Sequence, residues 1–280
     1  MEERPPVRRP VDTQTRLYGI IGHPVRHSLS PAMHNAAFLA AGENAVYLAF
    51  DVTDPAAALA GARALGIGGL SVTIPHKEAV LPLLDEVDPP ARRIGAVNTV
   101  IHRDGRLLGA NTDAAGAVRA LEEAIPLAGR RVVVLGAGGA ARAVAVGAAE
   151  RGASVHVANR TPERARAVAA LCGGTFSGLS EMPGEADVLV NTTPVGMAPA
   201  AGETPVPADR LPGFRVVMDI VYAPVETRLL REAAAAGCRV VNGLRMLLYQ
   251  AAAQFELWTG RPAPAAAMEA ALYRGLGEEG

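Results

Sequence analysis

A buried strand, a glycine-rich turn and an alanine-rich helix follow one another between residues 131 and 151. The strand reads RVVVL and the turn reads GAGGAA, which places Gly136 and Gly138 in a GxGxxA pattern. Because glycine has no Cβ, the chain can turn tightly there, and the pyrophosphate of a dinucleotide can approach the unpaired N–H groups that open the helix. The order of strand, glycines, helix and next strand predicts a dinucleotide-binding unit.

The alternation of strands and helices continues through the second half of the chain. Further strands are expected at 154–158, 187–191, 215–219 and 239–241. Helices are expected at 161–171, 227–236, 244–258 and 264–276, and a surface loop rich in Pro and Gly at 198–212. Strands that alternate with helices are typical of a parallel, doubly wound sheet, so the expected fold class is α/β.

The first half shows a similar pattern with clear helix signals. Strands are expected at 17–21, 45–50 and 69–73, helices at 55–65 and 113–124, and a hairpin at 96–102 and 106–108. Ser30 is expected to cap the first helix, with Pro31 at its first position and Gly42 just past its end. Another helix is expected to begin around His76 and to carry Lys77 in its first turn.

Composition excludes several classes of function. At 280 residues the chain has room for two domains, and with 50% hydrophobic and 20% charged residues it is expected to be globular. The net charge of −1 argues against a nucleic-acid surface or a polybasic membrane patch. There is no apolar run near the ~20 residues of a membrane span and no hydrophobic signal core at the N-terminus. We expect a cytoplasmic protein that acts on small molecules. Its residues 1–14 are expected to form a disordered leader.

The cysteines and histidines show no metal or disulfide pattern. Cys172 and Cys238 stand alone and far apart in the sequence, and a disulfide framework or zinc site would need more cysteines or a CxxC-type spacing. Both are expected to be free thiols that pack as small apolar residues. The 6 histidines are scattered without ligand spacing, so no metal site is predicted.

The segment after the strand at 154–158 bears on the choice of cofactor. Enzymes that use NAD usually place Asp or Glu there to bind the ribose 2′-OH. This chain has the sequence NRTPER, with Asn159, Arg160, Thr161 and Arg164, and no carboxylate at the strand end. Guanidinium groups suit the oxygens of a 2′-phosphate, which favours NADP. The alternative is that Thr161 only caps the next helix and both arginines are solvated.

Lys77 is the only lysine among the 27 basic residues, and it lies in the segment SVTIPHK. An arginine could supply the same charge but cannot release a proton at any useful pH, whereas a lysine can. An ammonium near a ketone can stabilise the negative charge that develops on its oxygen and can then protonate it. Taken alone, the position of a single remaining lysine can also be chance.

Two hydroxyls precede the first expected helix. Ser28 and Ser30 lie in the segment GHPVRHSLSPAMHN, two residues apart. At the start of a helix they could hold an anion such as a carboxylate. The alternative is that Ser30 only caps the helix and Ser28 only turns the chain.

Several motifs occur along the chain in a fixed order. They read GHPVRHSLSPAMHN, SVTIPHK, GAVNT, NTD, GAGGAAR, NRTPER, NTTPVGM and GLRMLLYQ. In these motifs and in their order the chain, from about Thr15 to Leu276, resembles the shikimate dehydrogenases. The resemblance implies a reversible conversion of 3-dehydroshikimate to shikimate with NADPH, in the route to chorismate and the aromatic amino acids.

The resemblance also implies roles for individual residues. Ser28 and Ser30 would hold the substrate carboxylate. The substrate hydroxyls and the reacting oxygen would be held by Thr73, Lys77, Asn98 and Asp113, with Tyr222 and Gln250 joining from the cofactor side. Lys77 and Asp113 would form the catalytic pair, with Asp113 holding the ammonium. The NADP site would consist of Gly136, Ala137, Gly138, Gly139, Ala140, Asn159, Arg160, Thr161, Arg164, Ile220 and Gly243.

The resemblance implies a division of the chain into two domains. An N-terminal α/β substrate domain would comprise 15–113 together with 244–280, and a Rossmann-like NADP domain with a doubly wound parallel sheet would comprise 114–243. The implied partners are the small-molecule substrate and the cofactor, without nucleic acid or membrane, in a monomer or a homodimer.

Four positions depart from the usual family pattern. Ser71 replaces the usual Asn before Val-Thr, and Ala114 replaces the usual Gly after NTD. Arg245 stands where a small residue is common, and Pro89 where a Glu can occur. None is an expected catalytic group, so these changes bear on loop geometry more than on the reaction.

Two other functions are compatible with the same motifs. A quinate/shikimate dehydrogenase that prefers NAD would differ beside the carboxylate, where quinate users often have Thr at the position of Ser30. A non-catalytic NADP-sensing homologue could keep the glycines and lose the proton-handling pair. The presence of both Lys77 and Asp113 favours an enzyme.

Overall fold

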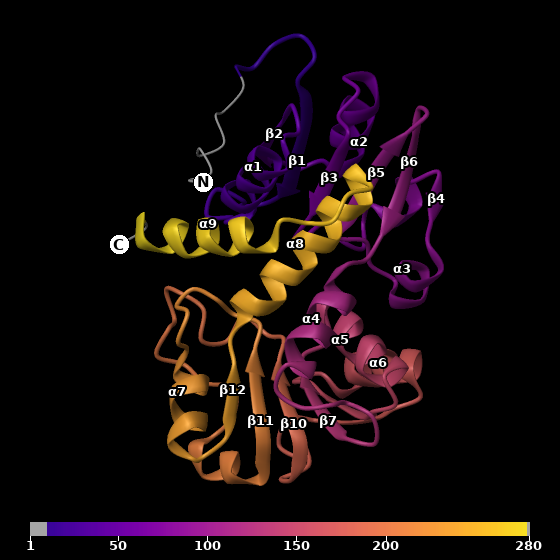
Figure 1. Ribbon diagram of the computed structural model, residues 1–280. Coiled ribbons are helices and arrows are strands. Elements are labelled where there is room, and N and C mark those ends of the chain that lie inside the picture. The colour runs from indigo at the N-terminus through magenta and orange to yellow at the C-terminus, as the bar shows by residue number, and fades with distance from the viewer. Residues whose placement is uncertain (1–9, 279–280) are drawn as a thin grey trace. The chain divides into compact units, whose positions relative to one another are not determined.

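The computed structural model describes residues 10–278, and the chain divides into two compact units (Figure 1). The first unit contains the chain up to Thr112 and again from Ala251, and the second unit runs from Asp113 to Gln250. The helix α8, Gly243–Thr259, therefore contributes to both units. Residues 1–9 of the predicted leader lie outside the described residues. No helix within the described residues is long and apolar enough to cross a membrane.

The first unit is built on a mixed six-stranded sheet. Its strands are β1 (Arg16–Gly22), β2 (Ala45–Asp51), β3 (Gly69–Val72), β4 (Glu86–Val87), β5 (Thr99–Arg103) and β6 (Arg106–Ala110). The sheet order is β2-β1-β3-β5-β6-β4. β1 is parallel to β2 and to β3, whereas β5 is antiparallel to both β3 and β6. The predicted hairpin forms, and Asp104 (φ 51) and Gly105 (φ 76) make its turn.

The helices of the first unit are α1 (Ser30–Ala41), α2 (Pro55–Ala64), α3 (Pro89–Ile94) and α9 (Ala265–Glu278), together with the end of α8. The predicted stop of α1 is confirmed, because Gly42 adopts a left-handed conformation with φ 69. The predicted cap is wrong. Leu29 occupies the N-cap, Ser30 is the first helical residue, and no side chain caps the helix.

The helix predicted from His76 does not form. Residues 76–80 make a turn, and a short 3-10 helix follows at Leu81–Leu83. Pro82 explains the difference, because it has no N–H to bond the carbonyl four residues earlier and its ring disfavours a continuing α-helix. The backbone therefore closes with the shorter bond from Leu83 N to Val80 O at 3.0 Å.

The second unit contains a six-stranded sheet in which all strands are parallel. Its strands are β7 (Arg131–Leu135), β8 (Ser154–Ala158), β9 (Thr175–Ser177), β10 (Ala186–Asn191), β11 (Phe214–Asp219) and β12 (Arg239–Val241), in the order β12-β11-β10-β7-β8-β9. The chain starts in the middle, builds one side and then the other, which is the doubly wound arrangement. The predicted fold class is confirmed.

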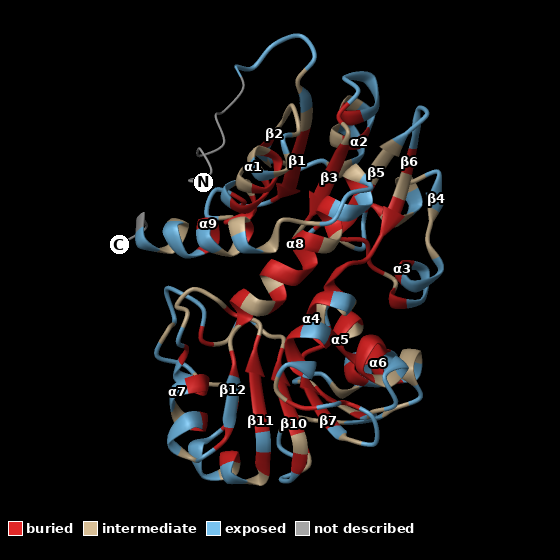
Figure 2. Ribbon diagram, in the orientation of Figure 1, coloured by how far each residue is buried: buried red, intermediate tan, exposed pale blue. Residues whose placement is uncertain are grey.

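The helices of the second unit are α4 (Asp113–Glu122), α5 (Gly139–Glu150), α6 (Pro162–Cys172), α7 (Arg228–Ala235) and the start of α8. Two short elements have no counterpart in the sequence-based expectation: β9, and a 3-10 helix at Ala208–Gly213 inside the predicted loop. The central strands and most of α5 are buried, as Figure 2 shows in red. Valines and leucines of β7, β10 and β11 fill this core.

Candidate active site

Five of the predicted substrate residues gather at one edge of the first sheet. β1, β3 and β6 end at this edge, and the antiparallel β5 begins there. Side chains just outside these strand ends therefore lie along the same edge. They are Ser28 and Ser30 after β1, Thr73 and Lys77 after β3, and Asn98 before β5.

Ser28 and Ser30 stand at the start of α1, where helical N–H groups have no partner within the helix. Ser28 Oγ accepts the backbone N–H of Ser30 at 3.3 Å, so its hydroxyl hydrogen can still be donated. Ser30, the first residue of α1, is 3% exposed. Two hydroxyls and the positive end of a helix dipole form a suitable site for a carboxylate.

The turn that carries Lys77 is fixed on both sides. His76 Nε2 bonds to the carbonyl of Val52 at 2.7 Å. The Val97 N–H donates to the Lys77 carbonyl at 2.8 Å, and the His76 N–H donates to the Thr73 carbonyl at 2.9 Å. The half-buried Lys77 therefore projects from a backbone that three hydrogen bonds hold in place.

Asn98 is buried and joins the start of β5 to the segment after β6. Its Oδ1 accepts from Thr112 N and from Thr99 Oγ1, both at 2.7 Å. Its Nδ2 donates to Thr112 Oγ1 at 2.9 Å. Asn111, next to Thr112, donates from Nδ2 to the Ala96 carbonyl at 2.8 Å. These bonds fix the orientation of the Asn98 amide.

A second amide, Gln254, contacts the residues at this edge of the sheet and was not predicted from the sequence. It is 1% exposed, and its Nε2 donates to the Asn98 carbonyl and to Thr99 Oγ1, both at 3.1 Å. Its Oε1 accepts from Ser71 Oγ at 2.8 Å. The available signal was a polar residue four positions after Gln250 in an otherwise apolar stretch of helix.

The glycine-rich turn of the second unit lies at the C-terminal end of β7, between β8 and β10. Gly136 has φ 114, and a Cβ there would come within 2.6 Å of Thr192 Oγ1, so only glycine fits. Gly138 is the N-cap of α5, and a Cβ on it would meet nothing within 4 Å. This leaves open space in front of the first N–H groups of α5, where a pyrophosphate can bind. Ala137, Gly139 and Ala140 complete the turn.

The segment after β8 presents positive charge to solvent. Arg160, Thr161 and Arg164 are exposed, and within residues 10–278 neither arginine forms an ion pair. Thr161 is the N-cap of α6, yet its side chain makes no capping bond. The hydroxyl and both guanidinium groups are therefore available to a phosphate, and these residues fit the 2′-phosphate of NADP. Asn159 Nδ2 donates to the Thr161 carbonyl at 3.0 Å and shapes the segment.

The remaining predicted cofactor residues lie at the ends of β11 and β12. Ile220 follows β11 directly, and Gly243 lies two residues after β12. A Cβ on Gly243 would come within 2.4 Å of the Ile220 carbonyl oxygen, so the two backbones approach closely only because residue 243 is glycine. Both residues share the C-terminal edge of the sheet with the glycine-rich turn, as the parallel strand order requires.

Three further predicted residues belong to the second unit. Asp113 is the first residue of α4 and is 4% exposed. Tyr222 is half-buried in the segment after β11. Gln250, on α8, is 9% exposed and donates from Nε2 to the Leu247 carbonyl at 3.0 Å. Lys77 and Asp113 thus belong to different units, and their pairing stays a prediction.

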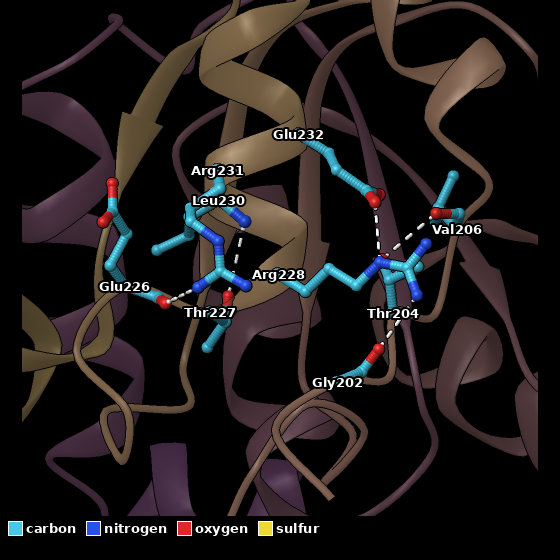
Figure 3. A network of polar contacts seen from close by, with 9 residues as sticks. All are labelled: Gly202, Thr204, Val206, Glu226, Thr227, Arg228, Leu230, Arg231 and Glu232. Carbon is cyan, nitrogen blue, oxygen red and sulfur yellow. Dashed lines mark hydrogen bonds and ion pairs between the residues drawn. The ribbon is translucent and has the colours of Figure 1, made fainter.

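The loop after β10 is attached to the start of α7, as Figure 3 shows. Arg228 Nη1 donates to the Gly202 carbonyl at 2.9 Å, and Arg228 Nε pairs with Glu232 Oε1 at 2.6 Å. Thr227 caps α7 by accepting the Leu230 N–H at 3.3 Å. The C-terminal edge of the sheet is therefore bordered by loops that are tied to its helices.

Known families match both units. The substrate binding domain of shikimate dehydrogenase matches residues 20–100, the shikimate / quinate 5-dehydrogenase family matches 119–198, and the shikimate 5'-dehydrogenase C-terminal domain matches 243–273. The NADP(+)-dependent shikimate dehydrogenase of Moorella thermoacetica is 53% identical over 282 residues, which span 95% of this chain and 96% of that protein.

Solved structures agree with this assignment. A crystal structure of a shikimate dehydrogenase in complex with NADP+ superposes with a TM-score of 0.91 at 44% identity, covering 95% of this chain and 97% of that one. The shikimate 5-dehydrogenase of Thermus thermophilus, in complex with NADP(H) and shikimate, gives 0.88 at 45% identity, covering 93% and 100%. These matches span both sheet edges described above, and the chain belongs to the shikimate dehydrogenase family.

Proposed function

We propose that this chain catalyses the reversible NADPH-dependent reduction of 3-dehydroshikimate to shikimate. The observation that carries the proposal is the position of its only lysine, Lys77, at the same sheet edge as Ser28, Ser30, Thr73 and Asn98. This edge offers hydroxyls, an amide and one ammonium, which are the groups that a carboxylated cyclic polyol needs. The names of the relatives support the same substrate and cofactor.

The proposed roles follow from the chemistry of each group. Ser28 and Ser30 bind the substrate carboxylate at the start of α1, and Thr73 and Asn98 bind its hydroxyls. NADPH supplies the hydride that reaches the carbonyl carbon. Lys77 stabilises the negative charge on the carbonyl oxygen and donates a proton from Nζ to it. In the reverse direction Lys77 takes this proton back from the hydroxyl.

Asp113 and two residues of the second unit complete the proposal. The Asp113 carboxylate holds the Lys77 ammonium and orients a substrate hydroxyl, and Tyr222 and Gln250 contact the substrate from the cofactor side. NADP is bound by the turn from Gly136 to Ala140 and by the segment from Asn159 to Arg164. The two exposed guanidinium groups and the uncommitted Thr161 hydroxyl favour NADP over NAD.

A direct assay tests the proposal. The purified chain is mixed with shikimate and NADP, and absorbance at the reduced-nicotinamide band is followed. We expect turnover with this pair and a far lower kcat/KM for quinate with NAD. A preference for quinate and NAD would support the quinate/shikimate alternative, and NADP binding without turnover of either substrate would support the non-catalytic alternative.

Two wider expectations belong to the same proposal. We place the activity in the cytoplasm, and both cysteines are free thiols, as in reducing compartments. The chain acts as a monomer or a homodimer, which sedimentation of the full chain distinguishes.

A further inference from the structure

A buried carboxylate that has no part in the proposed reaction lies at the C-terminal edge of the second sheet. Asp219, the last residue of β11, is 0% exposed. Burial raises the pKa of its carboxyl group, so keeping a charge here has a cost. A carboxylate buried in this way requires hydrogen-bond partners that replace the water it has lost.

The hydrogen bonds of Asp219 show what it holds. Its Oδ1 accepts from the Val221 N–H at 3.0 Å and from Asn191 Nδ2 at 2.9 Å. Its Oδ2 accepts from Thr227 Oγ1 at 2.7 Å, the threonine that caps α7 in Figure 3. One carboxylate thus joins the end of β10, the segment after β11 and the start of α7.

Asn191, which is bonded to Asp219, holds the loop that follows β10. Its Oδ1 accepts from Thr193 N at 3.0 Å and from Thr193 Oγ1 at 2.7 Å. Its Nδ2 also reaches the Val195 carbonyl at 3.3 Å. The Ile220 N–H in turn donates to the Asn191 carbonyl at 3.1 Å. The loop at 192–196 and the segment at 220–222 are therefore positioned by a single Asp219–Asn191 pair.

Both of these segments adjoin the proposed cofactor site. Thr192 comes within 2.6 Å of the position that a Cβ on Gly136 would occupy, and it donates to the Leu135 carbonyl. Ile220 and Tyr222 are the residues expected to contact the cofactor and the substrate. We propose that Asp219 is a positioning residue for NADP, because it sets the segments that follow β10 and β11, on the β10 side of the glycine-rich turn, before the cofactor binds. This inference rests on the proposed function only for the identity of the cofactor.

The chain offers a matched control at the opposite edge of the same sheet. Asp187, near the start of β10, accepts from Arg131 N at 2.9 Å and pairs with Arg130 and Arg215 at 3.4 Å. Its removal also deletes a hydrogen-bonded carboxylate from the second unit. It lies at the N-terminal end of β10, whereas the cofactor segments follow the C-terminal ends of the strands.

The experiment measures NADP binding by calorimetry without substrate, and amide hydrogen exchange in the cofactor-free protein. Asp219→Ala is expected to weaken NADP binding about tenfold or more, the scale of losing one or two hydrogen bonds to a charged group. Exchange is expected to accelerate at 192–196 and 220–222. Asp219→Asn, which keeps an acceptor for Val221 and Asn191, should restore affinity to within about threefold. Asp187→Ala should leave both readouts unchanged.

The inference is overturned if Asp219→Ala and Asp187→Ala change NADP affinity equally, or if Asp219→Ala changes neither readout. If Asp219→Ala does not fold, Asn191→Ser carries the same test with the same expected direction. Absence of shikimate turnover in the unaltered chain would count against the proposed function alone, because the binding and exchange measurements contain no substrate.

Discussion

The Ser71 hydroxyl donates a hydrogen bond to Gln254 Oε1 over 2.8 Å and so ties β3 to α8 inside the first unit. Tyr47 donates to the same Ser71 oxygen at 2.6 Å. Ser71 stands where the family usually has Asn, so in this chain one small hydroxyl both accepts and donates within a buried site. The substitution thus has a definite structural role.

Gln254→Leu should reduce the stability of the chain. The change deletes the hydrogen bonds from Gln254 to the Asn98 carbonyl, to Thr99 Oγ1 and to Ser71 Oγ, and each lost bond costs about 0.5–1.5 kcal/mol. Part of this cost is offset because leucine is apolar, so we expect the free energy of unfolding to fall by about 2–4 kcal/mol. Urea denaturation measures it. Ser71→Ala, which leaves the bonds to Asn98 and Thr99 intact, should cost less, and equal losses would contradict this network.

Lys77→Met should abolish most turnover and leave NADP binding intact. The proposed proton donor is lost, and kcat should fall by about 10²-fold or more, the scale of general acid catalysis. Absorbance at the reduced-nicotinamide band gives kcat, and calorimetry gives the Kd of NADP. Lys77→Arg separates the role of the charge from that of proton transfer, because arginine keeps the charge but cannot release a proton. Near-normal turnover in Lys77→Arg would show that only charge is needed.

Replacing both Arg160 and Arg164 with Ser should shift cofactor preference. Each guanidinium is expected to contact the 2′-phosphate, and a hydrogen bond to a charged group contributes about 1.5–3 kcal/mol. The KM for NADP should therefore rise at least about tenfold, whereas the KM for NAD should change little. Steady-state kinetics with both cofactors measure this. Arg166→Ser, on the exposed side of α6, serves as the control. An equal rise for NAD would refute the phosphate contact.

The parallel sheet and the glycine-rich turn could be predicted because local patterns encode them. The valine-rich sequence of β7 and the glycines at 136 and 138 are compatible with few structures other than a buried strand followed by a tight turn. The helix expected from His76 was wrong, because Pro82 prevents an α-helix from continuing there. Gln254 was missed because its partners lie 156 and 155 residues away in the sequence. Such long-range bonds leave no local pattern.

The role of Asp219 beside the proposed cofactor site also could not be predicted from the sequence. Asp219 follows three buried residues of β11, so its position in the sequence indicates only the end of a strand. Its importance depends on Asn191 and Thr227, and the bonds to them cross 28 and 8 residues. Sequence could name Ile220 as a cofactor residue by resemblance, but it could not show which buried group holds that residue in place.

His34 should make stability depend on pH below neutrality. It is 0% exposed and stacks on Tyr47 with ring centroids 4.5 Å apart, and within the described residues its Nδ1 has no hydrogen-bond partner. Burial lowers its pKa to about 3, whereas the unfolded chain keeps a value near 6.5. Between these values the unfolded state binds the extra proton, so the contribution is present above pH 6.5 and is lost as pH falls toward 3.

The expected loss between pH 7 and pH 5 is about 2 kcal/mol of unfolding free energy, since each pH unit contributes up to about 1.4 kcal/mol. Urea titrations at several pH values measure it. His34→Phe keeps an aromatic ring against Tyr47 and removes the titration, so most of this slope should disappear. His156, whose pKa partial burial also lowers, should leave a smaller slope. An unchanged slope in His34→Phe would place the pH dependence elsewhere in the chain.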